Sequence, residues 1–151
     1  MNLQILPVNP EQADELTRIA LAAKSHWGYP KRWIEIWAPQ LTFRPEYFVE
    51  NESWAAIDEY PIAFYTLLDK NGNAWIENLF VLPEFIGKGV GKMLFQHAVE
   101  ISHQRGYKVL QLEADPNAMG FYQKMGMYQI GERRSQVDGQ PRSLPLMEMK
   151  L

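Results

Sequence analysis

The first third of the chain passes from a short extended run to apolar residues at helical spacing. Leu3–Val8 predicts a first strand that Pro7 closes, because proline has no N–H to donate to a sheet. Asn9–Gln12 places a cap residue, a proline and a glutamine in the order typical of a helix start. The following apolar positions predict a helix with one buried face: Leu16, Ile19, Ala20, Ala23 and Trp27. Gly28–Pro30 ends it, and two short helical segments are expected next: Trp33–Trp37 and Arg44–Phe48.

The middle of the chain changes to the patterns of β-strands. Three apolar runs are separated by short turn sequences: Trp54–Ile57, Ile62–Leu68 and Trp75–Val81. Asn71–Asn73 contains the Asn-Gly pair typical of a tight hairpin, and Pro83 stops the third run. Three consecutive strands joined by tight turns predict an antiparallel meander.

The last third alternates helices with strands. Apolar residues from Val90 to Ile101 recur at helical spacing, and Gly106 marks the end of that helix. A strand, a short helix, a strand, a polar loop and a final strand are expected after it: Val109–Glu113, Asp115–Gly126, Tyr128–Ile130, Val137–Pro141 and Leu144–Met149. The order β-α-α-β-β-β-α-β-α-β-β predicts a mixed α/β (α+β) fold with a mostly antiparallel central sheet flanked by helices.

Length and composition indicate one globular domain over residues 1–151. With 46% hydrophobic and 22% charged residues, the chain has the composition of an ordinary folded protein. A net charge of −3 leaves no basic field for nucleic acid, and no apolar run is long enough for a membrane helix. Met1–Ile5 lacks the basic start and apolar stretch of a secretory signal. We therefore expect a cytoplasmic protein that binds neither nucleic acid nor membrane.

The residues that the chain lacks narrow the candidate chemistry. It has no cysteine, which excludes disulfides, thiolate metal sites and a cysteine nucleophile. The three histidines are His26, His97 and His103. They include neither a helical i, i+4 pair nor a His-Glu-x-x-His motif, so no metal is expected.

The segment Val81–Lys92 carries the strongest chemical signal. It runs from a predicted strand through a glycine-rich loop into the first turn of an amphipathic helix. Alternate glycines let the backbone approach a ligand closely, and free N–H groups at a helix start form an anion site. The glycines and the lysines beside them are Gly87, Lys88, Gly89, Gly91 and Lys92. The chemistry indicated is a diphosphate seated on the helix N-terminus.

Two other phosphate-binding loops do not fit this segment. A Walker loop needs glycine where Ile86 stands and serine or threonine where Met93 stands. The dinucleotide fingerprint needs two residues between its last glycines, whereas only Val90 separates Gly89 from Gly91. The alternative to a binding loop is a glycine-rich turn that lets the strand and the helix pack closely.

Two motifs in the correct order resemble the GNAT superfamily of acyl-CoA-dependent N-acetyltransferases. Gly89 and Gly91 fall on the small positions of the family signature Arg/Gln-x-x-Gly-x-Gly/Ala, and Ile86 stands where the family usually has Arg or Gln. Asp115–Met127 is similar to the family's Asn, Phe-Tyr, x-Lys-x-Gly-Phe segment after the fifth strand. The element order also matches, so the resemblance covers nearly the whole chain and implies a GNAT-like fold.

The resemblance implies transfer of an acetyl group from acetyl-CoA to a primary amine of a small molecule or protein, by direct attack. It implies that the pantetheine arm pairs like an extra strand with Leu79, Phe80 and Val81, where a bulge opens the cleft. The N–H of Phe80 would polarise the thioester carbonyl, while Asn117 and Phe121 line the other wall. The pyrophosphate would rest on the amides of the glycine loop: Gly87, Lys88, Gly89, Val90, Gly91 and Lys92.

Two residues are expected to move protons in that reaction. Tyr122 is the expected general acid for the departing thiolate, because a phenol with a pKa near 10 is a neutral donor at pH 7. The alternative for Tyr122 is packing, with its hydroxyl satisfied at the rim. Glu77 is the expected general base, with Glu113 or a chain of waters as alternatives. Either carboxylate would otherwise face solvent or pair with a lysine or arginine.

The acceptor side is expected to be aromatic. The resemblance implies that His26, Trp27 and Tyr29 lie at the acceptor pocket, where cation–π contact suits a cationic amine. Trp33 and Trp37 are more typical of packing.

The functional alternative is a catalytically weak acyl-CoA-binding sensor, favoured by Ile86 and by the open choice of base. The sequence does not name the acceptor amine. The edges of the terminal strands are expected to allow pairing in a homodimer.

Overall fold

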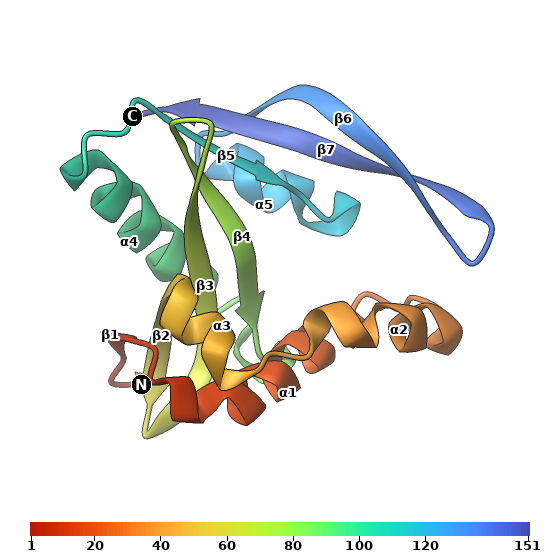
Figure 1. Ribbon diagram of the computed structural model, residues 1–151, viewed down its shortest axis with the longest axis horizontal. Helices are drawn as coiled ribbons and strands as arrows, with labels where there is room; N and C mark the ends of the chain where they lie inside the picture. Colours follow the sequence, from red (N-terminus) through yellow and green to blue (C-terminus); the bar gives the residue numbers. More distant parts are fainter.

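The hydrophobic pattern of the chain folds into one seven-stranded sheet, ordered β1-β2-β3-β4-β5-β7-β6 (Figure 1). The computed structural model describes residues 1–151. The strands are β1 (Gln4–Pro7), β2 (Glu52–Asp58), β3 (Tyr60–Lys70), β4 (Asn73–Val81), β5 (Val109–Glu113), β6 (Tyr128–Val137) and β7 (Gln140–Lys150). The helices are α1 (Ala13–Ser25), α2 (Lys31–Trp37), α3 (Pro45–Glu50), α4 (Val90–Gln104) and α5 (Met119–Lys124). Short 3-10 turns lie at Pro10–Gln12, Ala38–Leu41, Pro83–Phe85 and Pro116–Ala118.

Helices cover both faces of the sheet, as two neighbouring residues of β3 show. Phe64 packs its ring against Phe43, whose main-chain N–H donates to the Thr17 hydroxyl of α1. Tyr65 instead shares a 2.7 Å hydrogen bond with His97 of α4. Successive strand residues point to opposite faces, so α1 and α4 lie on opposite sides of the sheet. Phe64 and Tyr65 are both fully buried, and the core therefore fills both layers.

The predicted fold class is confirmed. Strands β2, β3 and β4 form the expected antiparallel meander, and β4 and β5 form a parallel pair beside it. Strands β5, β7 and β6 continue the sheet with antiparallel pairing. The mixed, mostly antiparallel sheet with flanking helices is the architecture that the element order predicts.

Two segments differ from the expectation. The helical segment expected at Arg44–Phe48 is present as a separate helix, α3, so three helices precede the meander where the expected order has two. The loop expected at Val137–Pro141 is only the two-residue turn of a long hairpin, because Asp138 and Gly139 both adopt positive φ angles and reverse the chain at once. Most residues of β6 are exposed and polar, so the sequence lacks the alternation of apolar and polar residues that would have predicted the full length of this strand.

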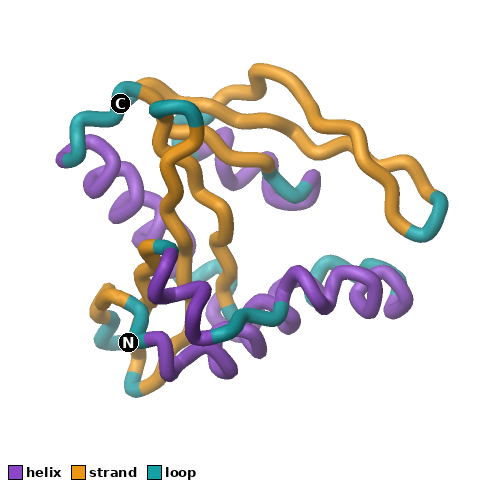
Figure 2. The backbone as a smooth tube through the Cα atoms, viewed as in Figure 1, coloured by secondary structure: helices purple, strands orange, loops and turns teal.

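The second half of the sheet turns away from the first. Figure 1 shows β5, β7 and β6 leaving the upper end of β4 and reaching out above α2. Figure 2 shows the same hairpin, in orange, standing opposite the helical N-terminal part. We call the helical N-terminal part with α2 and the outer strands β5, β7 and β6 the two arms of the molecule. An exposed ion pair joins them, with Arg32 Nε of α2 lying 3.4 Å from Asp138 Oδ1 of the hairpin turn.

The sheet ends at β1 on one side and at β6 on the other. The final strand, β7, lies between β5 and β6, so its edges are already paired and it cannot offer the free edge expected for a dimer. None of the helices combines the length and the apolar content that a membrane crossing requires.

Candidate active site

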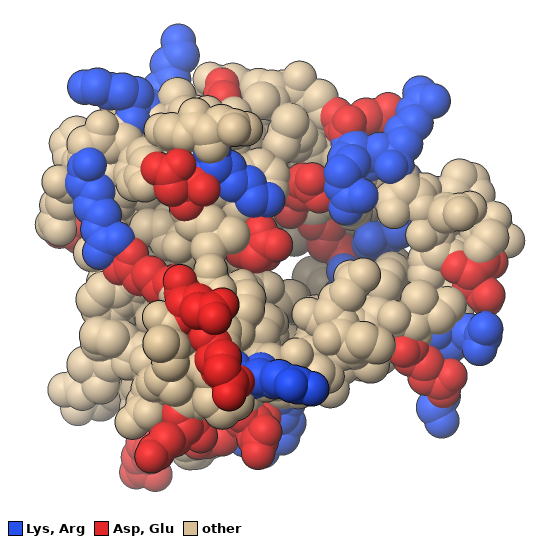
Figure 3. All heavy atoms as spheres, viewed as in Figure 1, with Lys and Arg blue, Asp and Glu red and all other residues tan.

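The candidate site is a cleft that begins where β4 and β5 separate. Residues 74 and 75 of β4 pair with β5, and the pairing stops there. On its other side β4 has a bulge: Thr66 of β3 pairs with Asn78, the next residue Leu67 pairs with Ile76, and Glu77 is left over. A bulge bends a strand and increases its twist, which separates β4 from its neighbour. The cleft has a volume of about 740 Å³ (Figure 3 shows this face hollowed between the two arms).

The main-chain edge of β4 that faces the cleft is set by the register of the meander. The N–H of Leu82 donates to Ile62 of β3 at 2.9 Å. Amide directions alternate along a strand, so the N–H of Phe80 also points toward β3, and those of Leu79 and Val81 point away from it. The expectation that Phe80 supplies the polarising N–H is therefore wrong. Leu79 and Val81, which both line the cleft, present the open amides.

The glycine loop supplies a second set of free amides. None of the six main-chain N–H groups from Gly87 to Lys92 donates to another protein group, and the first helical bond belongs to Met93, which donates to Gly89. Gly87 and Gly89 have φ angles of 81° and 82°, a conformation that costs other residues energy. Unpaired N–H groups and the positive end of α4 together make an anion site.

The third glycine and the neighbouring side chains shape this end of the cleft. A Cβ on Gly91 would lie 3.4 Å from the Phe121 ring, so glycine lets α4 and α5 approach closely. Lys92 and Ile86 line the cleft, whereas Lys88 is exposed beside the Phe85 ring. The Val90 side chain is buried in the core, so only its main chain can reach a ligand.

Tyr122 lies on α5 with its hydroxyl open to the cleft. The residue is 7% exposed and lines the cleft, and its hydroxyl has no hydrogen-bond partner in the protein. No buried side-chain oxygen is left unpaired, so this hydroxyl is not sealed away from the cleft. Burial raises the pKa of Tyr122 well above its ordinary value of 10. The phenol therefore stays protonated at every pH at which the protein would work.

The two candidate bases are held by cations. Glu77 Oε2 accepts from the indole N–H of Trp75 at 2.8 Å and lies 3.5 Å from the Lys70 ammonium. Glu113 accepts from Arg133 at 2.9 Å. Both carboxylates line the cleft.

The three aromatic residues expected at the acceptor pocket lie in different places. Trp27 lines the cleft, with 39% of its surface exposed. His26 is exposed outside the lining and packs edge-on against Trp27. Tyr29 lies outside the lining too, and its ring packs edge-on against Trp37, which does line the cleft.

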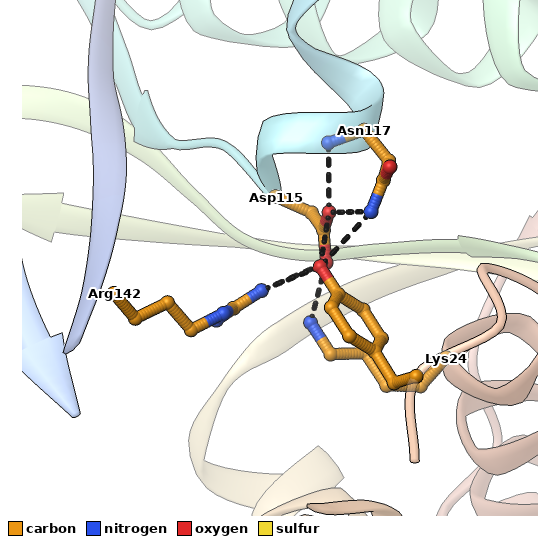
Figure 4. A network of polar contacts seen from close by, with 5 residues as sticks. Lys24, Asp115, Asn117 and Arg142 are labelled. Carbon is orange, nitrogen blue, oxygen red and sulfur yellow. Dashed lines mark hydrogen bonds and ion pairs between the residues drawn. The ribbon is translucent and has the colours of Figure 1, made fainter. Parts of the chain in front are cut away.

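Asp115 is the centre of a polar network that joins four separate segments (Figure 4). Its carboxylate accepts from the Lys24 ammonium at 2.7 Å, from the Tyr29 hydroxyl at 2.9 Å and from the Arg142 guanidinium at 3.2 Å. The main-chain N–H and side-chain amide of Asn117 donate to it as well. The Asn117 amide that was expected on the cofactor wall is thus also part of this network. We call these five residues the Asp115 network.

Sequence reasoning did not single out Lys24, Asp115 or Arg142 as site residues. Lys24 and Asp115 are 91 positions apart, and no local pattern connects them. The available signal is that Lys24 falls four residues after Ala20, on the apolar side of its helix. A charged residue at such a position needs a buried partner.

Burial and charge act against each other in the network. Burial alone would raise the pKa of Asp115, but the hydrogen bond and charge of Lys24 outweigh it and hold that pKa below 3.8. Burial lowers the pKa of Lys24 below 10.5, although the bond to Asp115 opposes this. The ion pair is nonetheless charged at neutral pH.

Comparison with known proteins identifies a family whose model matches most of the chain. The model of the acetyltransferase (GNAT) family matches residues 13–127, from the start of α1 to the end of the α5 segment. The chain belongs to the GNAT acetyltransferase family. A Salmonella typhimurium protein, peptidyl-lysine N-acetyltransferase YjaB, is 32% identical over 106 residues, which cover 69% of this chain and 68% of the relative.

Solved structures show the same fold over the whole acetyltransferase. A GCN5-related N-acetyltransferase from Rhodopseudomonas palustris superposes with a TM-score of 0.85 at 23% identity, covering 100% of this chain and 97% of the other. The PaiA N-acetyltransferase from Thermoplasma acidophilum, solved in complex with coenzyme A, gives 0.78 at 22% identity and covers 100% of both chains. Family and cleft together support acetyl transfer to amines, and a sensor without catalysis is not favoured.

We expect Asp115→Asn to destabilise the acetyltransferase by about 3 kcal/mol at pH 7, because Lys24 and Arg142 would remain as unpaired, mostly buried cations. Urea unfolding measures the change. The matched control is Asp138→Asn, whose exposed pair with Arg32 should contribute less than about 1 kcal/mol.

The loss of stability in Asp115→Asn should depend on pH, because the pKa of Asp115 is lowered in the folded protein. The stability from this carboxylate is fully present above pH 3.8 and is lost as the pH falls through the lower, folded-state value. Equal losses in the two variants at pH 7 would contradict a stabilising role for the Asp115 network.

Proposed function

We propose that this acetyltransferase moves the acetyl group of acetyl-CoA to a primary amine by direct attack within the cleft. The observation that carries the proposal is the row of six unpaired amides from Gly87 to Lys92, which continues toward the open main-chain edge of β4. Such a row fits a diphosphate at one end and an extended amide-bearing arm along the other. The coenzyme A complex of the PaiA protein supports this choice of donor.

The donor would be held mainly by main-chain groups. The amides of the glycine loop and the Lys92 ammonium would bind the diphosphate, while Leu79 and Val81 would pair with the pantetheine arm like a neighbouring strand. Phe121, packed against Gly91, forms the opposite wall. Ile86 replaces the usual Arg or Gln at a position where the main chain does the binding, so its side chain leaves the anion site intact.

The acetyl transfer needs one main-chain donor for the oxyanion. The amine nitrogen attacks the thioester carbonyl carbon, and the negative charge that develops on the carbonyl oxygen requires a fixed N–H. The open N–H groups of Leu79 and Val81 are the two donors on this edge, and we assign this role to one of them in place of Phe80, while the other binds the pantetheine arm. A main-chain donor held by strand pairing needs no reorganisation during the reaction.

Two side chains would complete the proton balance. As the carbon–sulfur bond breaks, Tyr122 donates its phenolic proton to the departing thiolate. The ammonium form of the acceptor first loses one proton through water to Glu77, which Trp75 and Lys70 hold at the cleft, and the neutral amine then attacks. After the attack the nitrogen loses its second proton by the same route, once Glu77 has passed the first proton to solvent. Glu77 then releases its proton to solvent and the Tyr122 phenolate regains one from solvent, which restores the enzyme with a net release of one proton.

Acetyl-CoA should raise the melting temperature and, with an amine, release free thiol. A ligand at about 100 times its Kd stabilises the folded state by about 2.7 kcal/mol, a shift of several degrees for a chain of this size. Thermal unfolding and a thiol-detecting assay with a mixed set of primary amines measure the two effects. Inorganic phosphate at equal ionic strength is the control.

The two measurements separate the alternatives. No shift at millimolar acetyl-CoA would contradict the donor assignment. A clear shift without thiol release from any amine would instead support an acyl-CoA sensor.

A further inference from the structure

The charges that line the cleft do not balance around Asp115, in the part of the cleft near Trp27 and Trp37. Each carboxylate of the lining has a cation of its own: Glu77 with Lys70, Glu113 with Arg133 and Asp115 with Lys24. Arg142 is a second cation on Asp115, at 3.2 Å. The Asp115 network therefore carries one more positive charge than negative charge. A mostly buried cation in excess favours an anion from outside the protein.

Arg142 reaches into the network with only one of its nitrogens. Its Nη2 donates to the Tyr29 hydroxyl at 2.7 Å and to Asp115 at 3.2 Å. Figure 4 shows the guanidinium of Arg142 pointing toward Asp115. Its Nε and Nη1 have no protein acceptor, although the side chain is only 11% exposed. No fully buried side-chain nitrogen lacks a partner, so Nε and Nη1 keep exposed surface, and Arg142 is one of the residues that line the cleft. A guanidinium edge with two free N–H groups matches an oxyanion.

The guanidinium is held in place before any ligand binds. Its carbon lies 4.7 Å from the centre of the Trp37 ring, and the Lys24 ammonium lies 4.6 Å from that ring. The Tyr29 hydroxyl and the Asp115 carboxylate fix its other edge. A side chain already fixed loses little rotamer entropy when a ligand binds.

We infer that the acceptor is a small amine that also bears an oxyanion, either a carboxylate or a phosphate. This anion binds Nε and Nη1 of Arg142. This inference rests on the proposed acetyl transfer and names the class of its acceptor. Lys24 lies beside the same position and adds positive charge. Trp27, Ile36 and Leu144 line the neighbouring wall and suit an apolar body between the two polar groups.

The test compares amines that differ only by the anion. L-phenylalanine is paired with phenethylamine for a carboxylate, and phosphoethanolamine with ethanolamine for a phosphate. We expect the anionic member of one pair to have the higher kcat/KM, and the pair that responds identifies the anion. Arg142→Gln should lower that preference by about ten- to a hundredfold, the usual effect of losing charge-assisted hydrogen bonds. Comparing ratios between variant and parent cancels differences in amine basicity.

Arg134→Gln is the matched control. It removes one arginine from the same hairpin, but Arg134 is 88% exposed and does not line the cleft. The preference for the anionic member should be unchanged in this variant. If Arg142 only supported the fold, its replacement would slow both members of each pair equally, and an unchanged ratio would overturn the inference.

Binding separates this inference from the proposed function. Calorimetric titration of the same four amines into the CoA-loaded enzyme needs no turnover. Tighter binding of an anionic member that is lost in Arg142→Gln supports the acceptor class even if no amine releases thiol, in which case only acetyl transfer fails. Equal binding within both pairs overturns the acceptor class and leaves the transfer reaction standing.

Discussion

Tyr122→Phe should lower turnover by about 10²–10⁴-fold while acetyl-CoA affinity stays near that of the parent. The phenyl ring keeps its packing against Phe95 and Phe121, and the hydroxyl that is removed has no partner in the protein. The free energy of unfolding should therefore hardly change. Steady-state kinetics, a titration with acetyl-CoA and urea unfolding measure the three quantities.

A second tyrosine gives the opposite result and serves as the control. Tyr65→Phe removes a hydroxyl that is bonded to His97 on the far face of the sheet. That variant should lose about 1 kcal/mol of stability and keep its turnover. If Tyr122→Phe retained turnover within a few-fold, the thiolate would leave unassisted or through water.

Two further measurements test Tyr122 as the general acid: the dependence of turnover on the acidity of the donor thiol and its dependence on pH. The effect of the substitution should shrink with a donor whose thiol is more acidic, because such a group needs less protonation. Burial raises the pKa of Tyr122 above 10, so the parent enzyme should not lose its acid as the pH rises to that value. A loss of activity with an apparent pKa below 10 would belong to another group.

Gly89→Val should reduce acetyl-CoA affinity by about a hundredfold or more. A branched Cβ would enter open space beside the unpaired amides, and the φ angle of 82° would force the loop to shift. Losing two charge-assisted hydrogen bonds, each of about 1.5–3 kcal/mol, accounts for this loss of affinity. The strain also lowers stability by about 1–2 kcal/mol.

The opposite end of α4 offers a control with the same strain. Gly106 has a φ angle of 83° and likewise has no atom within 4 Å of an added Cβ. Gly106→Val should therefore lose similar stability without losing acetyl-CoA. Equal affinities in both variants, measured by calorimetry, would mean that the glycine loop does not hold the diphosphate.

The local patterns of the sequence were sufficient to predict the helices and strands and the glycine loop of the site. The helical spacing around Leu16 and Leu94, the Asn-Gly turn at residue 72 and the proline after β4 all describe interactions between near neighbours. The free amides of the glycine loop follow the same logic, because a helix start leaves its own N–H groups unpaired. The cytoplasmic location and a homodimer stay predictions.

Tertiary structure decided which groups face the cleft. The open amides belong to Leu79 and Val81 rather than Phe80, because the register with β3 fixes the direction of each N–H after the bulge at Glu77. Register depends on pairing with a strand elsewhere in the chain, and a shift by one residue reverses every direction. Residue spacing alone cannot determine that choice.

The Asp115 network shows the same division most clearly. The sequence alone marked Asp115 as part of a motif at a helix start, and that local role is present, since its side chain accepts from the N–H of Asn117. Its ion pairs with Lys24 and Arg142 join residues 91 and 27 positions away. The helical spacing places Lys24 on the apolar side of α1, but nothing in the sequence names its partner, and Arg142 carries no such signal. A mostly buried charge requires a partner, and only the tertiary structure shows which partner it has.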